Sequence, residues 1–322
     1  MTRYRLAGGL ARKIHHVLWH THAMIENNIE PATLKTIAAQ SIDLASTHYE
    51  NFPVASVFLP AHLREPVALI YSFARQSDDF ADEGDLTIEQ RLNLLKSFRD
   101  ELDLLHAYIK PTTTFFVALG NMIKVRKLPY APFYALLDAF SQDVTKTRYA
   151  NFKEVLDYCE RSANPIGELL LHLYEESTPE NIRLSDNICT ALQIINFLQD
   201  IAIDFKKNDG KQRIYMCQNE LVAYGITEQQ IQNFVDGTTP VSENWQRFMH
   251  FNLERANDLL NTGKPLGRIL KGRIGFEMRL IVAGGARIIH KIGKVNGDIF
   301  KHRPKLNYWD WLTVFLKALF KI

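Results

Sequence analysis

The 322-residue chain has only three cysteines, Cys159, Cys189 and Cys217, and none of them forms a Cys-x-x-Cys pair. An odd number of cysteines without metal-ligand spacing argues against a disulfide framework and a zinc site, and favours a reducing compartment. The chain also lacks a run of 18 apolar residues, so a membrane-spanning helix is not expected. Its basic first 24 residues lack the continuous apolar segment of a cleaved secretory signal.

The chain has 38 basic and 36 acidic residues, so neither sign of charge dominates. A nucleic-acid partner is therefore not expected, and any electrostatic function must be local. No Gly-x-Gly-x-x-Gly follows a strand pattern, which leaves a built-in dinucleotide site unsupported. No repeat of fixed period is present, so a solenoid is not supported either.

Helical periodicity is present almost everywhere instead. Apolar residues recur at spacings of three and four in eight segments: 66–82, 91–109, 113–124, 131–143, 152–175, 186–205, 244–262 and 275–292. Convincing period-two strands are hard to find. The sequence therefore predicts one all-α domain.

Helix boundaries are predicted from local chemistry. The Thr-Pro pair at 178–179 opens a short helical segment, and the Ser-Asp pair at 185–186 can cap the next one. The Gly-Lys-Pro sequence at 263–265 ends another helix. The polar connector 206–213 contains Asn-Asp-Gly and predicts a loop.

Residues 78–83 read DDFADE and end an otherwise apolar helical pattern. Spacings of four, three and four place Tyr71, Arg75, Asp78 and Asp82 on one side of that helix. Carboxylates near the last turn of a helix are disfavoured by about 0.3 to 1 kcal/mol each, so something else must favour them. The plain alternative is a solvated acidic helix end.

A second polar stripe lies in 186–205, a segment that is apolar around most of its circumference. Gln193, Asn196, Asp200 and Asp204 are spaced three, four and four apart. Two carboxylates on a buried helix must face a wet cavity, a cation or a basic partner. A structural salt-bridge network is the alternative.

Two helices that each present two aspartates can face each other inside a bundle. Carboxylates about 6 Å apart repel by roughly 3 kcal/mol per pair at an effective dielectric of 20, and divalent cations relieve that repulsion. Oxygen ligands suit Mg²⁺, which binds through carboxylates together with substrate phosphates. A di-iron bundle would need Glu-x-x-His, which the chain lacks. A diphosphate substrate is therefore predicted, and basic residues beside the two stripes fit it: Arg75, Lys206, Lys207, Lys211 and Arg213.

The ordered pair DDFADE and QIINFLQDIAID resembles the squalene and phytoene synthase family, over about residues 40 to 295. That resemblance implies an isoprenoid synthase fold, a single helical bundle around a central active-site cavity. By resemblance, four residues hold Mg²⁺ ions that bridge the diphosphate: Asp78, Asp82, Asp200 and Asp204. Five residues match substrate-binding positions: Tyr71, Arg75, Gln193, Asn196 and Arg213. Tyr158 matches a cavity tyrosine, beside a kinked helix whose matching positions are Ala163, Ile166 and Gly167.

Residues 48–85, HYENFPVASVFLPAHLREPVALIYSFARQSDDFADEGD, are similar to the bacterial hydroxysqualene synthase branch of that family, associated with hopanoid biosynthesis. This implies conversion of presqualene diphosphate and water to hydroxysqualene and diphosphate, a carbon–oxygen lyase reaction. A presqualene diphosphate synthase would supply the substrate, and a flavin-dependent reductase would convert the product to squalene. Four residues of this stretch match substrate-proximal positions: His48, Tyr49, Glu50 and Asn51. The candidate substrate-binding residues here are His48, Asn51 and Phe52. Glu50 or Tyr158 is the candidate catalytic residue that orients the quenching water.

Two other functions stay open. The first is head-to-head condensation of two prenyl diphosphates, to presqualene diphosphate or a carotenoid precursor; the second is a catalytically silent helical scaffold. The sequence GKQRIYMCQNEL also departs from the Gly-Arg-Ile-Tyr-Leu-Pro that is usual in the family, although Arg213 and Tyr215 are kept.

The expected organisation is a basic extension at 1–30, a catalytic domain at 31–295 and an amphipathic tail at 296–322. In the tail, five apolar residues lie near one helical face: Leu312, Phe315, Leu316, Leu319 and Ile322. A docked terminal helix and an interfacial membrane helix both fit this pattern. The expected location is the cytoplasm, with peripheral contact to the inner membrane.

Overall fold

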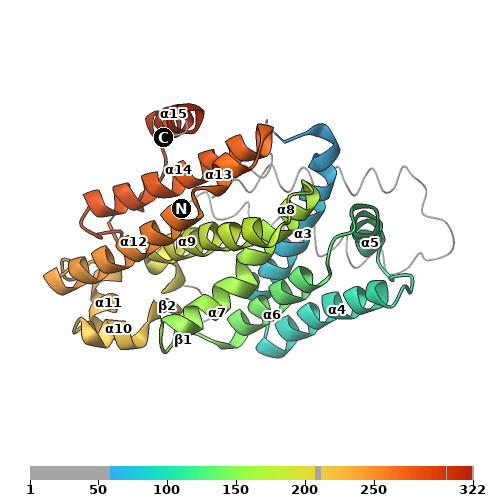
Figure 1. The fold of residues 1–322 in the computed structure, drawn as a ribbon. Coiled ribbons are helices and arrows are strands. Elements are labelled where there is room, and N and C mark those ends of the chain that lie inside the picture. Colours follow the sequence, from blue (N-terminus) through green and yellow to red (C-terminus); the bar gives the residue numbers. More distant parts are fainter. Residues whose placement is uncertain (1–58, 207–211, 302, 321–322) are drawn as a thin grey trace. The chain divides into compact units, whose positions relative to one another are not determined.

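The computed structural model describes residues 59–206, 212–301 and 303–320. These residues form helices and two short strands, which confirms the all-α prediction (Figure 1). They divide into two compact units: residues 61–130, and residues 131–320 with the short segment 59–60. Among the described helices, none combines the length and the hydropathy that crossing a bilayer needs. The predicted domain boundaries at 30 and 295 stay a prediction.

The first unit contains α3 (Ala61–Asp82), α4 (Ile88–His106) and α5 (Thr114–Arg126). Aromatic rings hold the three helices together, since the Phe98 ring lies 5.7 Å from Phe73 and 4.9 Å from Phe116. Such ring pairs each contribute about 0.5 to 1.5 kcal/mol beyond their buried area. This packing fixes the inner face of α3, the helix that carries the first aspartate stripe.

The second unit begins with α6 (Ala131–Thr145), β1 (Arg148–Tyr149), α7 (Phe152–Ser162) and α8 (Asn164–Leu173). The helical pattern predicted over 152–175 is interrupted between α7 and α8, at the place where the family resemblance implied a kinked helix around Ala163. Pro165 stands in the first turn of α8. A proline has no amide hydrogen to continue the preceding helix, and its ring clashes with the carbonyl four residues earlier.

The longest helix of the second unit is α9 (Pro179–Asp204), which has 26 residues. Thr178 caps it, because its hydroxyl oxygen accepts a hydrogen bond from the Asn181 amide at 3.2 Å. The predicted new start at 185–186 is wrong, since the helix runs straight through. Ser185 is only 1% exposed. Its hydroxyl packs against Gly167, where an added Cβ would lie 2.3 Å from the Ser185 Oγ, so this serine packs between helices instead of capping one.

The remaining elements follow in chain order: β2 (Ile214–Cys217), α10 (Gln218–Ala223), α11 (Glu228–Val235), α12 (Glu243–Gly263), α13 (Leu266–Ile269), α14 (Gly272–Lys294) and α15 (Tyr308–Phe320). The end of α12 at Gly263 confirms the boundary predicted from Gly-Lys-Pro. β1 and β2 pair in parallel, with Arg148 opposite Ile214. These strands have two and four residues, too short to leave a period-two pattern in the sequence.

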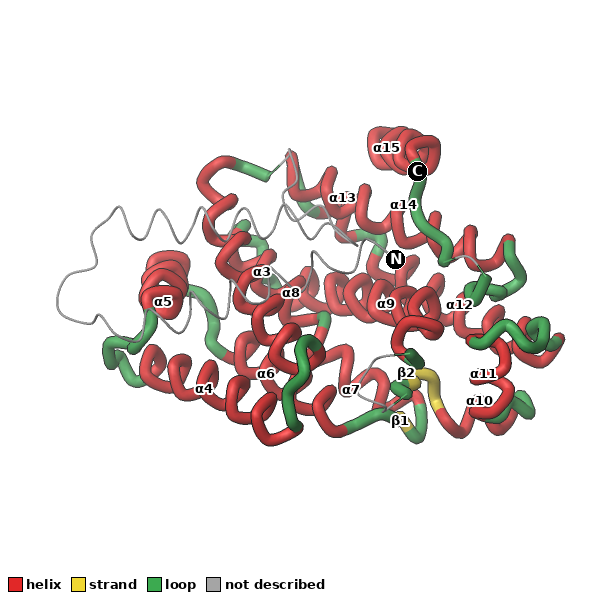
Figure 2. Tube along the Cα trace, turned by 180° about the vertical axis from the view of Figure 1, so that it is seen from behind, coloured by secondary structure: helices red, strands yellow, loops and turns green. Residues whose placement is uncertain are grey.

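α9 is the centre of the second unit, because α8, α12 and α14 all pack against it (Figures 1 and 2). Its apolar residues join the large core cluster around Trp245 and Phe248, both of which are completely buried. α15 packs on α14, on the side away from α9 (Figure 2). The fold therefore fixes α9 from several sides and leaves its polar stripe as the exception to be explained.

Candidate functional site

The polar stripe of α9 has the form that the sequence predicts. Gln193, Asn196, Asp200 and Asp204 are all partly buried. Five of the residues between them are part of the core and at most 5% exposed: Ile194, Ile195, Phe197, Leu198 and Ile201. Ile203, in the last turn, is 51% exposed. Carboxylates in such a setting need a charged or hydrogen-bonding partner.

Asp200 has such a partner in Arg303. The Arg303 guanidinium forms a two-pronged ion pair with the carboxylate, with Nη2 2.9 Å from Oδ2 and Nε bonded to Oδ1. Asn196 donates a further hydrogen bond of 2.8 Å to the same Oδ2. The side chains of Arg303 and Asp200 are only 17% and 14% exposed, so water screens the pair weakly. This carboxylate therefore binds a cation in the structure.

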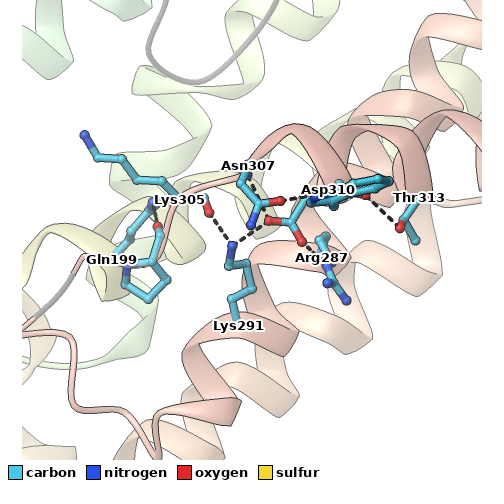
Figure 3. Close-up of polar contacts among 9 residues, drawn as sticks. Gln199, Arg287, Lys291, Lys305, Asn307, Asp310 and Thr313 are labelled. Atoms are coloured by element: carbon cyan, nitrogen blue, oxygen red, sulfur yellow. Dashed lines mark hydrogen bonds and ion pairs between the residues drawn. The ribbon is translucent and has the colours of Figure 1, made fainter.

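Sequence reasoning placed the cations of this stripe in the loop that follows α9, not in Arg303. Lys206 is exposed, and Lys207 and Lys211 lie outside the described residues. The segment that carries Arg303 is anchored to α9. The side-chain amide of Gln199 on α9 donates a hydrogen bond to the backbone carbonyl of Pro304, the residue after Arg303 (Figure 3). The pairing joins residues 103 positions apart, which no local spacing could have predicted.

The first stripe also lies where the sequence predicts it. Tyr71, Arg75, Asp78 and Asp82 are partly buried residues of α3. Nη2 of Arg75 lies 2.7 Å from the Asp79 carboxylate, and Nη1 lies 3.4 Å from that of Asp78. Burial alone would lower the pKa of Arg75, but the negative charges of Asp78 and Asp79 raise it above its ordinary value. Asp79 therefore supports the positive charge of Arg75.

A residue that sequence reasoning missed explains how α3 tolerates acids at its end. The Arg91 guanidinium, on α4, donates to three carbonyl oxygens in and just after the last turn of α3, those of Phe80, Glu83 and Gly84, at 3.2, 3.0 and 2.8 Å. Arg91 is 5% exposed. Its charge offsets the negative end of the helix dipole, the term that disfavours DDFADE there. The acidic helix end is thus compensated within the protein.

A buried tyrosine cluster surrounds Asp143, a residue that the sequence did not single out. The Tyr158 hydroxyl donates to one Asp143 oxygen at 2.6 Å, and the Tyr215 hydroxyl donates to the other at 3.1 Å. Burial, and then the charge of Asp143, raise the pKa of Tyr158 well above its ordinary value. Tyr158 therefore keeps its proton and points it at Asp143; its role in orienting water stays a prediction.

Arg213 belongs to the same cluster. It is 3% exposed, and its guanidinium donates to the Asp143 backbone carbonyl at 2.8 Å and to the Tyr215 hydroxyl oxygen at 3.1 Å. The cluster ties α6, α7 and the start of β2 together. Binding of diphosphate by Arg213 stays a prediction, and the structure shows which contacts such binding would have to rearrange.

Four candidate residues lie outside the described residues: His48, Glu50, Asn51 and Phe52. Within the described part of the chain, no three His, Cys, Asp or Glu side chains gather as a ready metal site. The two aspartate stripes belong to different units, α3 to the first and α9 to the second. Metal binding by both stripes together therefore stays a prediction.

Comparison with known proteins defines the class of the chain. Its fold matches the crystal structure of the squalene synthase HpnC from Alicyclobacillus acidocaldarius, with a TM-score of 0.74, 32% identity and coverage of 83% of this chain and 97% of the other. A dehydrosqualene synthase structure matches with a TM-score of 0.75 at 17% identity, which supports the fold alone. The protein thus has the isoprenoid synthase fold.

The chain belongs to the squalene/phytoene synthase family, whose sequence description matches residues 45–310. It is 32% identical to the hydroxysqualene synthase of Rhodopseudomonas palustris, over 79% of this chain and 84% of that protein. It is also 33% identical to the presqualene diphosphate synthase of Sinorhizobium fredii, over 52% of this chain and 58% of that protein. The family that the two aspartate motifs predicted is therefore confirmed, and it is a family of enzymes.

Proposed function

We propose that this protein converts presqualene diphosphate and water into hydroxysqualene and diphosphate, in squalene and hopanoid biosynthesis. One observation carries the proposal: the similarity to a hydroxysqualene synthase extends over 84% of the length of that relative. A presqualene diphosphate synthase would supply the substrate and a flavin-dependent reductase would consume the product. We place the reaction in the cytoplasm.

The donor set fits magnesium. Asp78, Asp82, Asp200 and Asp204 would hold it, and partly buried carboxylates with a neutral amide donor beside them are oxygen ligands of the kind it prefers. Asp200 already binds a cation, the Arg303 guanidinium. When bound, magnesium would stabilise the negative charge that grows on the departing diphosphate.

The remaining chemistry falls to the chain itself. The bond between carbon and the diphosphate oxygen breaks, the carbocation rearranges, and a water oxygen bonds to carbon and loses a proton. Arg75, whose positive charge its two acidic neighbours reinforce, would bind the diphosphate. Tyr158 would orient the water through its hydroxyl oxygen, because its proton is committed to Asp143. Glu50 is the other candidate for orienting the water, and the proton that the water loses would pass to the released diphosphate.

The test is a product assay without NADPH. Purified protein and Mg²⁺ are incubated separately with presqualene diphosphate and with farnesyl diphosphate, and the products are identified by mass spectrometry. Hydroxysqualene from the first substrate alone supports the proposal. Asp82→Asn and Asp200→Asn are expected to lower turnover by at least a hundredfold. Asp100→Asn, which loses only an exposed pair with Lys96, is the matched control and keeps full activity.

The second candidate function is head-to-head condensation of two prenyl diphosphates. The 33% identity to a presqualene diphosphate synthase favours it, although over only 52% of this chain. A cyclopropyl diphosphate formed from farnesyl diphosphate would establish it in place of the first. Absence of turnover with both substrates, with Mg²⁺ leaving the thermal stability unchanged, would leave the helical scaffold.

A further inference from the structure

Exposed apolar surface is concentrated on α15. Among the described residues, sixteen large hydrophobic side chains are exposed, and half of them belong to this one helix. They are Tyr308, Trp309, Trp311, Leu312, Phe315, Leu316, Leu319 and Phe320. The other eight are spread over the rest of the described chain, as on most soluble proteins. A continuous apolar face of this kind marks an interaction surface.

The N-terminal end of α15 is fixed by a buried carboxylate. Asp310 is 1% exposed and accepts a hydrogen bond of 2.6 Å from Arg287 and one from Lys291, both on α14 (Figure 3). Asn307 adds two hydrogen bonds of 2.9 Å. Its backbone N–H donates to the Asp310 carboxylate, and its side-chain carbonyl oxygen accepts from the backbone N–H of Asp310. Burial alone would raise the pKa of Asp310, but these donors hold it well below its usual range.

The other end of α15 is fixed as well. Arg279, also on α14, donates to the Ala318 carbonyl at 2.8 Å. Val314 and Ala318 are each 1% exposed and pack against Leu280. These contacts confirm a docked helix but correct its orientation: the docked face is a narrow strip of small residues, and the wide apolar face predicted from the sequence points outward.

The charged residues of α15 and of the segment before it indicate the kind of partner that suits the outward face. The only acidic residue of α15 is Asp310, and it is buried by its contacts with α14. The exposed charged residues in and just before α15 are cations, Lys305 in the preceding segment and Lys317 within the helix. An apolar face flanked by lysines and headed by Trp309 and Tyr308 matches the chemistry of an anionic lipid surface, where aromatic rings favour the headgroup level.

We propose that α15 is an interfacial helix that seats this enzyme on an anionic bilayer. Its leucine and phenylalanine side chains enter the boundary between headgroups and acyl chains, and Lys305 and Lys317 meet the phosphates. Contacts of α14 with Asp310 and with the Ala318 carbonyl hold the helix in place. The apolar face is therefore already formed before the protein meets a membrane. The proposal is independent of the reaction proposed above, because it concerns binding to lipid and not turnover.

The test is co-sedimentation of the full chain with sucrose-loaded vesicles. We expect binding to vesicles of equal phosphatidylglycerol and phosphatidylcholine, with a blue shift of tryptophan fluorescence, and at least tenfold weaker binding to phosphatidylcholine alone. The double variant Leu312→Asp with Leu316→Asp loses binding by at least tenfold. Val222→Asp is the matched control, because Val222 is 75% exposed on α10 and lies outside the face.

A second variant separates loss of binding from loss of folding. Lys305→Glu with Lys317→Glu leaves the apolar contacts intact and is expected to abolish the preference for phosphatidylglycerol. Equal binding of wild type and the leucine variant would overturn the proposal, as would failure of the wild type to bind anionic vesicles. A wild-type dimer that the leucine variant converts to a monomer, without vesicle binding, would assign the face to a second copy of the chain instead.

Discussion

Replacing Arg303 by glutamine tests whether the guanidinium that pairs with Asp200 of α9 competes with a metal for that carboxylate. The substitution removes the guanidinium that forms a bidentate ion pair with both oxygens of Asp200. That carboxylate then keeps the hydrogen bond from Asn196. Removing one member of a fully buried pair costs about 3 to 5 kcal/mol. An exposed pair contributes about 0 to 1 kcal/mol.

This pair lies nearer the buried limit, since its side chains are 17% and 14% exposed. Asn196 keeps part of the compensation, so we expect a loss of about 2 to 3 kcal/mol in the free energy of unfolding. At about 2 °C per kcal/mol for a chain of this size, the melting temperature of the metal-free protein should fall by about 5 °C. Magnesium at a hundred times its dissociation constant would return about 2.7 kcal/mol.

The assay is thermal unfolding with and without Mg²⁺, which needs no substrate. Arg303→Gln should melt lower than wild type without metal and gain more from Mg²⁺, because no guanidinium competes for Asp200. Lys305→Gln is the matched control, since it removes a nearby exposed cation that pairs with no carboxylate through its side chain in the structure. Equal melting temperatures and equal magnesium shifts in Arg303→Gln and wild type would show that Arg303 neither stabilises Asp200 nor competes with a metal for it.

Three further predictions follow from the second unit. Burial and the neighbouring Glu168 raise the pKa of Asp186 to about 6 from 3.8, so the contribution of Asp186 to stability should fall as pH rises from about 4 to 6. Asp186→Asn should remove this pH dependence from the unfolding curves. The variant should be more stable than wild type at pH 7 by about 1 kcal/mol, a value reduced because Asp186 is partly exposed to solvent. Gly167→Ala should destabilise by about 1 to 3 kcal/mol in urea titrations, because its Cβ would meet the Ser185 Oγ at 2.3 Å. Asp143→Ala should cost about 3 kcal/mol in the same titrations, since two buried tyrosine hydroxyls lose their acceptor, whereas an unchanged midpoint would show that water replaces it.

The fold could be predicted where the signal is local. The start of α9 at Thr178 and Pro179 and the end of α12 at Gly263 depend on capping and ring chemistry within a few residues. The false boundary at Ser185 has the opposite cause. Serine followed by aspartate has cap chemistry, but its surroundings are set by Gly167 on another helix. Tertiary packing therefore overrode a local preference that was real.

The candidate site could be predicted as far as helical spacing extends. The two stripes follow from positions three and four apart, and the structure places their residues on α3 and α9 as expected. Arg91, Arg303 and Asp143 could not be found this way. Each contacts groups in another element, the two arginines through a long side chain and Asp143 through a buried carboxylate, and nothing in its own neighbourhood in the sequence marks that contact.

Arg91 and Arg75 change what the acidic end of α3 implies. Acids at a helix end demand positive charge, and the sequence alone suggested that a ligand must supply it. Arg91 and Arg75 supply it from within the protein, so the acidity of DDFADE is no evidence for a metal by itself. At Asp200 the same logic has a further consequence. A guanidinium that satisfies this carboxylate would also compete with a metal for it, so magnesium binding at the α9 stripe, as proposed above, would be weaker than at a bare carboxylate by the free energy of the Arg303 pair.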